Sequence, residues 1–166
     1  MTTLGSLRGI FVLLIILNIP VDSIGDNQKP FLYEHKLTSF VDSKDPSVVG
    51  KKQVNFTEND QEIYAWAHYK WLDLTDTDHS IRFDWYSPIG DLYSSSTVNF
   101  CECVFDDYLY SKIYINCSKE KNGSSCIDPN LTLETNQSLH GNWQVNVSLD
   151  NEYQYTEKFV FRIEST

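Results

Sequence analysis

Two segments of this chain, 79–86 and 141–149, alternate apolar and polar side chains residue by residue, and that period constrains the fold more than any other feature. A third segment, 62–72, precedes them and divides its side chains between two faces with the same period. Successive side chains of a strand point to opposite faces, so each segment can present one apolar face to a core. No window of a dozen residues carries a sustained apolar pattern at helical spacing. The inward set of the last two segments is expected to be Ile81, Phe83, Trp85, Trp143, Val145, Val147 and Leu149.

The remaining segments extend this pattern into a complete all-β fold. Strands are also expected over 31–40, 92–104 and 153–163, with Pro, Gly, Asn or Asp in the turns between them. About seven strands at this spacing predict a single antiparallel β-sandwich of the immunoglobulin-like kind. Residues 106–117 fit either a strand or one short helical turn followed by a strand. Segment 62–72 is apolar on both faces, which favours a central strand whose second face is also partly covered.

Six Asn-X-Ser/Thr sequons indicate a chain that carries sugar. The content of Asn, Ser and Thr would give about two by chance. The excess predicts an exported glycoprotein, because this modification belongs to secretory pathways. The acceptors are Asn55, Asn116, Asn122, Asn130, Asn136 and Asn146.

Residues 1–25 have the pattern of a signal peptide. Arg8 supplies the positive charge, an apolar stretch follows, and the small residues Ser23 and Gly25 offer cleavage points. The alternative is an uncleaved membrane anchor, which is the one way in which the chain would be held in a membrane. The apolar stretch is short of the roughly 20 residues that span a bilayer, so cleavage is the expectation. The chain then divides into a leader, an N-terminal strand and linker at 26–60, and a sandwich core at 61–166 with a glycosylated loop at 118–138.

Four cysteines, Cys101, Cys103, Cys117 and Cys126, predict two disulfides in an exported chain. A bond between Cys101 and Cys103 would close a tight ring and is discounted. Two pairings stay open, Cys101–Cys117 with Cys103–Cys126, or Cys101–Cys126 with Cys103–Cys117. The spacing matches no usual zinc knuckle, so a four-thiolate metal site is disfavoured.

The net charge is −10 and the sequence pI is about 4.7. An acidic surface repels phosphate backbones, so nucleic acid is not an expected partner.

Two segments resemble immunoglobulin-like and macroglobulin-like extracellular sandwich modules. Residues 83–93 read Phe-Asp-Trp-Tyr-Ser-Pro-Ile-Gly-Asp-Leu-Tyr, and residues 141–147 read Gly-Asn-Trp-Gln-Val-Asn-Val. In such modules an aromatic strand runs into a Pro-X-Gly turn, and a later Gly-X-Trp pair starts the last hairpin. The resemblance covers residues 60–163 and implies a fold style without catalytic residues. The Cys…Trp…Cys order of antibody domains is missing, since Trp66 and Trp85 precede every cysteine.

Aromatic side chains provide the candidate ligand platform. Trp71, Trp85 and Trp143 are in phase with apolar faces and are expected in the core. Tyr64, Trp66 and Tyr86 lie on the opposite faces of their strands and are the candidate exposed patch. Flat aromatic faces of this kind can stack on sugar rings.

Other chemistry has weaker support. Asp73, Asp76 and Asp78 place oxygen ligands in one loop, which makes them a calcium candidate, although the Gly and the distal Glu of an EF-hand are missing. The histidines form no His-X-His pair, and neither a nucleophile elbow nor a phosphate-binding loop is present. No enzyme activity and no cofactor are expected.

The sequence therefore predicts a secreted or cell-surface binding or adhesion module, whose partner is an extracellular protein or glycan. A carbohydrate-binding module with an aromatic platform, or a structural part of a surface coat, are the alternatives.

Overall fold

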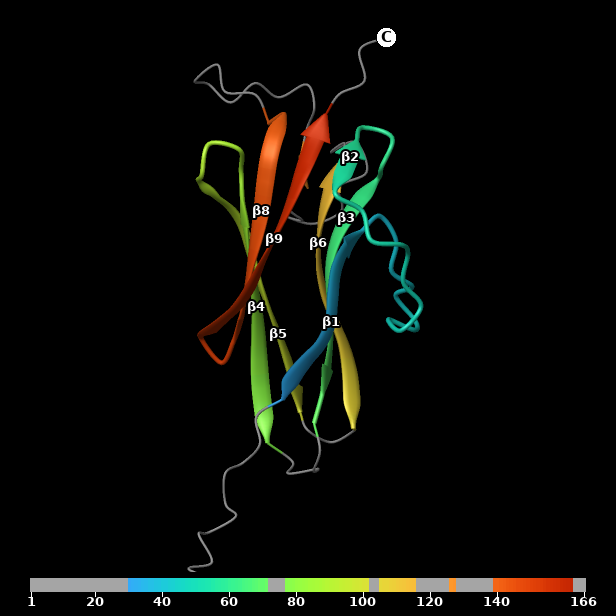
Figure 1. The fold of residues 1–166 in the computed structure, drawn as a ribbon, viewed down its shortest axis with the longest axis vertical. Helices are drawn as coiled ribbons and strands as arrows, with labels where there is room; N and C mark the ends of the chain where they lie inside the picture. Colours follow the sequence, from blue (N-terminus) through green and yellow to red (C-terminus); the bar gives the residue numbers. More distant parts are fainter. Residues whose placement is uncertain (1–29, 72–76, 102–104, 116–125, 128–138, 163–166) are drawn as a thin grey trace, which may run out of the picture.

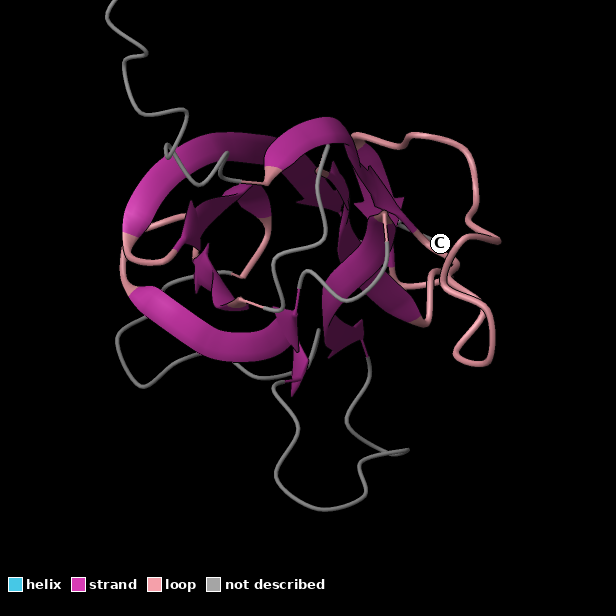
Figure 2. Ribbon diagram, turned by 90° about the horizontal axis from the view of Figure 1, so that it is seen from below, coloured by secondary structure: helices cyan, strands magenta, loops and turns pink. Residues whose placement is uncertain are grey.

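The computed structural model describes residues 30–71, 77–101, 105–115, 126–127 and 139–162. These residues form two β-sheets packed face to face, as Figures 1 and 2 show. The predicted leader at 1–25 and nearly all of the predicted loop at 118–138 lie outside the described residues. The all-β sandwich is confirmed.

One sheet has four strands in the order β1-β3-β6-β7, and the other has five in the order β2-β9-β8-β4-β5. This is more than the predicted seven, because β2 and β7 are only three and two residues long. The strand bounds are β1 Phe31–Thr38, β2 Asn55–Thr57, β3 Glu62–Lys70, β4 Asp78–Tyr86, β5 Leu92–Cys101, β6 Asp106–Ile115, β7 Cys126–Ile127, β8 Gly141–Leu149 and β9 Glu152–Arg162.

The long strands pair antiparallel, whereas the two short strands pair parallel, β2 with β9 and β7 with β6. Strands β1 and β2 both fall within the predicted N-terminal segment 26–60. That segment therefore supplies a strand to each sheet of the sandwich.

The core lies between the sheets and contains the predicted inward residues. Trp71, Trp85 and Trp143 are all buried, as predicted. The indole nitrogen of Trp85 donates a 3.0 Å hydrogen bond to Oγ of Ser111 on β6, which satisfies its polar atom inside the apolar layer. Residues 106–115 form strand β6 throughout, so the alternative of a helical turn is not realised within that range.

A buried carboxylate joins the two sheets at one edge. Glu157 on β9 is 7% exposed, and its Oε1 lies 2.7 Å from Nδ1 of His35 on β1. The Nζ of Lys52 lies 3.3 Å from the same oxygen. The ring of His35 stacks on Tyr155, with 4.0 Å between centroids. His35 and Lys52 thus supply the polar partners that a buried carboxylate requires.

Two tight turns form where Pro, Gly, Asp and Asn stand between the expected strands. In the 87–91 turn Gly90 has a φ of 90°, a conformation that glycine adopts without strain. Asp150 and Asn151 join β8 to β9 with φ values of 50° and 67°, as a two-residue hairpin turn of type I′ requires.

Candidate binding faces

The predicted platform of Tyr64, Trp66 and Tyr86 is not formed. Tyr64 and Trp66 do lie on the outer face of β3, but they are only 6% and 2% exposed. Tyr86 belongs to β4 in the other sheet. The prediction was wrong because the segment after β1 folds back over β3 and buries its second face.

That covering segment comprises residues 40–50. Val41 and Val49 form a β-bridge within it, and both pack with Tyr64 and Trp66. The Nε1 of Trp66 donates a 2.8 Å hydrogen bond to the carbonyl oxygen of Pro46. Strand β3 is apolar on both faces because this loop covers one face and the core covers the other.

Next to this cover, the four-stranded sheet presents a row of stacked rings that we call the aromatic face: Tyr33, His68 and Tyr108. The imidazole of His68 stacks on Tyr108 with centroids 4.3 Å apart, and Tyr33 meets His68 edge-on at 5.0 Å. Tyr33 is 60% exposed, whereas His68 is only 6% exposed. The aromatic face thus has a buried imidazole, held by its neighbouring rings, and an exposed phenol at its rim.

Three lysines lie over aromatic rings on this side of the sheet. The Nζ of Lys70 lies 3.9 Å from the centroid of Tyr33. Lys36 lies over Trp66 at 4.8 Å and also binds Glu34 at 2.8 Å. Lys112 lies over Tyr114 at 4.6 Å and binds Glu62 at 2.7 Å. Cation–π contacts at exposed sites contribute about 0.5–1 kcal/mol each, so they hold the rings in place.

Burial shifts the pKa values of His68 and Tyr64, on this side of the sheet, toward their neutral forms. Burial lowers the pKa of His68, and Lys70 lowers it further, while Asp106 opposes both. The Nε2 of His68 is buried without a hydrogen-bond partner and lies 3.8 Å from Oδ1 of Asp106. Burial and the hydrogen bond to Glu62 raise the pKa of Tyr64 to about 12. Polar contacts on this face would therefore come from neutral rings and from lysines.

Sequence reasoning missed Tyr33 and Tyr108 as surface residues. The signal was available for Tyr108, because a strand over 106–115 places it on the opposite face from Leu109 and Ile113. For Tyr33 the alternation is interrupted, since the pairing of β1 with β3 shifts register between Leu32 and Glu34. An irregularity of this kind turns a side chain to the other face and leaves no clear mark in the sequence.

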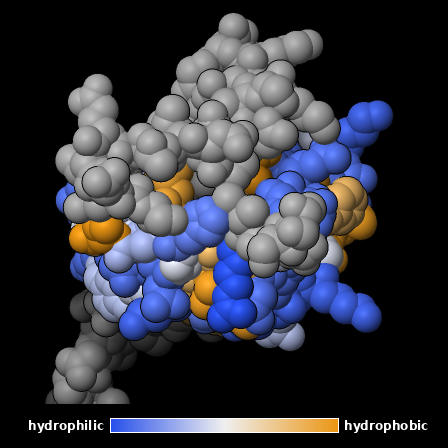
Figure 3. All heavy atoms as spheres, turned by 90° about the horizontal axis from the view of Figure 1, so that it is seen from above, coloured by the Kyte–Doolittle hydropathy of each residue, from blue (hydrophilic) through white to orange (hydrophobic). Residues whose placement is uncertain are grey.

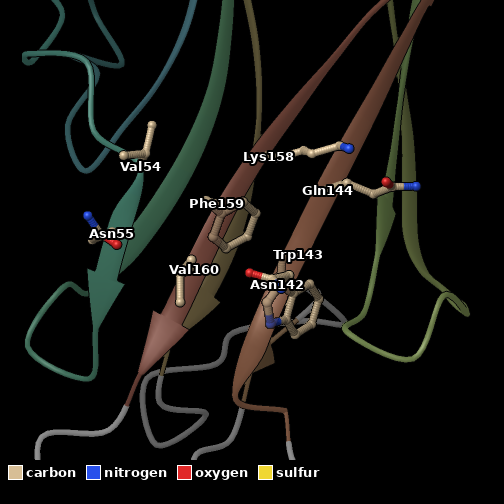
Figure 4. Close-up of a pocket in the computed structure, with 8 residues that line it drawn as sticks. All are labelled: Val54, Asn55, Asn142, Trp143, Gln144, Lys158, Phe159 and Val160. Carbon is tan, nitrogen blue, oxygen red and sulfur yellow. The ribbon is translucent and has the colours of Figure 1, made fainter.

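The outer face of the five-stranded sheet carries a groove of about 470 Å³. Figure 4 shows the groove residues on β2, β9 and β8. The lining residues are Val54, Asn55, Asn142, Trp143, Gln144, Lys158, Phe159 and Val160. Seen from one end, the described surface shows apolar residues as separate spots among hydrophilic ones (Figure 3).

Two of the six predicted glycan acceptors are described, and both belong to this five-stranded sheet. Asn55 is exposed on β2, next to the buried Phe56. Asn146 alternates with the buried Val145 and Val147 on β8, so it faces outward as predicted. The Oδ1 of Asn146 accepts a 2.6 Å hydrogen bond from Thr156, which leaves its Nδ2 available for a sugar. The other four acceptors lie outside the described residues.

One of the two predicted cysteine pairings conflicts with the positions of Cys101 and Cys126. Cys101 ends β5, where its neighbour Phe100 packs on Tyr69 and Trp71. Cys126 pairs with Tyr114 near the far end of β6.

Phe100, the neighbour of Cys101, packs on Tyr69, and Tyr69 pairs with Asp107 at the near end of β6. Asp107 and Tyr114 are separated by about 23 Å along β6. A disulfide needs Cα atoms within about 7 Å, so Cys101 cannot bond Cys126. The predicted pairing that joins Cys101 to Cys126 is therefore wrong, because strand β6 separates the two along its length. The other predicted pairing, Cys101–Cys117 with Cys103–Cys126, falls on Cys103 and Cys117, which lie outside the described residues.

The remaining predicted features have the following positions. Asp78 begins β4 opposite Cys101, and Asp73 and Asp76 of the calcium candidate lie outside the described residues. Among the described residues, no group of three or more His, Cys, Asp or Glu side chains could hold a metal ion.

The described part of the chain also contains no helix with the length and apolar character needed to cross a membrane.

Comparison with known proteins gives fold-level likeness alone. No protein-family model matches the chain, and no curated protein matches its sequence. An immunoglobulin-like protein from Pseudomonas aeruginosa is similar over 83% of this chain and 100% of its own, at 9% identity and a TM-score of 0.43.

Two enzymes contain a similar region. The alkylpurine DNA glycosylase AlkC from Pseudomonas fluorescens matches 80% of this chain at 8% identity and a TM-score of 0.44. The β-glucuronidase from Parabacteroides merdae matches 80% of this chain at 12% identity and a TM-score of 0.36. The chain spans 30% and 14% of the lengths of these two proteins.

Proposed function

We propose that this protein is an exported, N-glycosylated, non-catalytic binding module, and that it binds its partner through the aromatic face. One observation carries the proposal, namely that the two outer faces of the sandwich differ. The face of the four-stranded sheet carries Tyr33, His68, Tyr108 and the lysine Lys70. The face of the five-stranded sheet carries the two described glycan acceptors, Asn55 and Asn146.

The composition of the aromatic face suits recognition. Tyrosine offers a large contact area with few rotatable bonds, so ordering it on binding costs little entropy. The rings are already held by mutual stacking and by Lys70, so the surface is preorganised. Sugar on the opposite sheet would leave this face open to a partner.

A glycan ligand is the second candidate. The exposed Tyr33 ring beside the ammonium of Lys70 has the chemistry of a sugar-stacking platform. A protein ligand would use the same rings as anchors, so the two candidates share residues and differ in partner.

The experiment has two parts. Expression in a secretory eukaryotic host should deliver the protein to the medium, with an electrophoretic shift on endoglycosidase treatment. The purified protein is then applied to a glycan array and to intact cells. Binding that falls at least tenfold in Tyr33→Ala with Tyr108→Ala, and not in Tyr153→Ala, supports the aromatic face. Tyr153 is the matched control, because it is 64% exposed on β9 of the other sheet.

Binding to the array identifies a glycan ligand, and binding to cells that protease treatment removes identifies a protein ligand. Equal binding by all variants would contradict the proposed face. Retention of the chain inside the host cell, without sugar, would contradict the export on which the proposal depends.

A further inference from the structure

The groove on the five-stranded sheet contains a predicted glycan acceptor in its own wall. Asn55 lines it from β2, and Asn142 and Gln144 line it from β8 (Figure 4). Val160 of β9 pairs with Asn55 on one side and with Asn142 on the other. Asn55 and Asn142 are thus two strand spacings apart, about 10 Å, a span that the first two sugar rings of a glycan can bridge.

The backbone of Asn55 is held firmly beside the groove. The next residue, Phe56, is fully buried and meets Phe159 edge-on at 5.4 Å. The amide of Val160 donates to the carbonyl oxygen of Val54 at 2.9 Å, and Nε2 of Gln53 donates to the carbonyl oxygen of Asn55 at 2.8 Å. A sugar attached to the exposed side chain would start from a fixed point.

The lining matches the chemistry of the amino sugars that begin an N-linked glycan. The amides of Asn142 and Gln144 each carry donors and an acceptor, which suit sugar hydroxyls and an acetamido group. Val54 and Val160 supply apolar contact for the CH face of a ring. The volume of about 470 Å³ falls within the range of about 300–1,000 Å³ that small ligands occupy.

Covalent attachment to Asn55 also removes most of the entropy cost of binding a sugar in the groove. A short tether gives an effective concentration in the millimolar range, so weak contacts suffice. The other described acceptor, Asn146, does not line the groove. It therefore provides a comparison within the same sheet.

We propose that the first sugars of an N-linked glycan on Asn55 lie in this groove and hydrogen-bond to Asn142 and Gln144, so that the glycan ties β2 to β8 across β9. This deepens the proposed function and rests on its export through a glycosylating pathway. The five-stranded sheet would then be completed by sugar as well as by backbone hydrogen bonds.

A double-mutant cycle tests the proposal on the glycosylated full chain. Site occupancy is first measured by mass spectrometry at Asn55 and Asn146. Thermal unfolding then compares Asn142→Ala in the wild-type and Asn55→Gln backgrounds. We expect Asn142→Ala to lower Tm by about 2–4 °C when the glycan is present, and by less than about 1 °C without it. In the Asn146→Gln background the effect of Asn142→Ala should remain at its wild-type size.

Equal effects of Asn142→Ala in the wild-type and Asn55→Gln backgrounds would overturn the proposal, because the glycan would then have no coupling to the groove. An unmodified Asn55 in a chain glycosylated elsewhere would also overturn it, while leaving the proposed function intact. A chain without sugar at any site would overturn both.

Discussion

The indole nitrogen of Trp66 and the carbonyl oxygen of Pro46 are joined by a 2.8 Å hydrogen bond that fastens the 40–50 segment over β3. Val41 and Val49 complete this cover. The bond spans 20 residues of sequence and links a strand to a loop that would otherwise have few anchors. It explains why an aromatic residue on the outer side of the sheet is buried.

Trp66→Phe is expected to loosen this cover. Phenylalanine keeps most of the ring contacts but cannot donate to Pro46, and leaving a partly buried acceptor unpaired costs about 1–3 kcal/mol. Urea unfolding measures the loss, and trypsin should cleave faster after Lys44 and Lys51. The half-exposed Val48 supplies the control, since Val48→Ala should change stability by about 0.5 kcal/mol or less. Unchanged proteolysis in Trp66→Phe would contradict the anchoring role.

The buried Glu157 is expected to be the most sensitive charged residue among those described. Glu157→Gln keeps the shape but removes the charge, and charge-assisted hydrogen bonds to His35 and Lys52 contribute about twice as much as neutral ones. A loss of about 1–2 kcal/mol in the free energy of unfolding is expected. Asp84→Asn is the control, because its partner Arg82 is exposed and such pairs contribute about 0–1 kcal/mol. Equal losses of unfolding free energy in the two variants would contradict the greater sensitivity expected of Glu157.

His68 is expected to make the protein less stable in acid. Its folded-state pKa lies below the unfolded value of about 6.5, so the unfolded chain binds the proton more readily. Stability is lost as the pH falls below about 6.5 toward the folded-state pKa. The neighbouring groups are Asp106, Lys70 and Tyr108.

The chain contains three other histidines, so the comparison uses His68→Gln. The difference in unfolding free energy between wild type and His68→Gln, measured in urea at pH 7.5 and 5.5, should shift against the wild type at the lower pH. A difference that stays constant, or that shifts in favour of the wild type, would mean that burial does not disfavour the charged imidazole.

Each disulfide is expected to join two cysteines that lie at the same end of the sandwich. Strand β6 separates Cys101 from Cys126, and the two residues from Ile115 to Cys117 span at most about 7 Å, so the expected pairing is Cys101–Cys103 with Cys117–Cys126. Peptide mapping of the exported protein without reduction should find Cys117 linked to Cys126. It should also find the peptide containing Cys101 and Cys103 closed to alkylation. A peptide that joins Cys101 to Cys126 would contradict the described positions of β5 and β7.

Local alternation was enough to predict the sandwich and most of its core. Phe83, Trp85 and Trp143 point inward because each lies in phase with other apolar residues on a strand of period two. The turns at 87–91 and 150–151 were equally readable, because Gly90 and Asn151 are residues that adopt positive φ.

The candidate site could not be predicted in the same way. Whether Trp66 is exposed depends on residues 40–50, which return to β3 from a distance in the sequence and leave no periodic signal. The separation of Tyr86 from Tyr64 depends on which strand joins which sheet, and strand order is a property of the whole topology. The predicted bond between Cys101 and Cys126 failed for the same reason, since spacing along the chain does not reveal that β6 runs between them.

The pairing of β2 with β9 has a consequence for biosynthesis. Among the described strands β2 pairs with β9 alone, and β9 is the last of these strands in the sequence. Ribosomes add about 5–20 residues per second, so the roughly hundred residues between Thr57 and the end of β9 leave Asn55 without its strand partner for roughly 5 to 20 s. On the proposed route of export, the sequon is not yet paired in the sheet during that interval, so a cotranslational transferase can reach it.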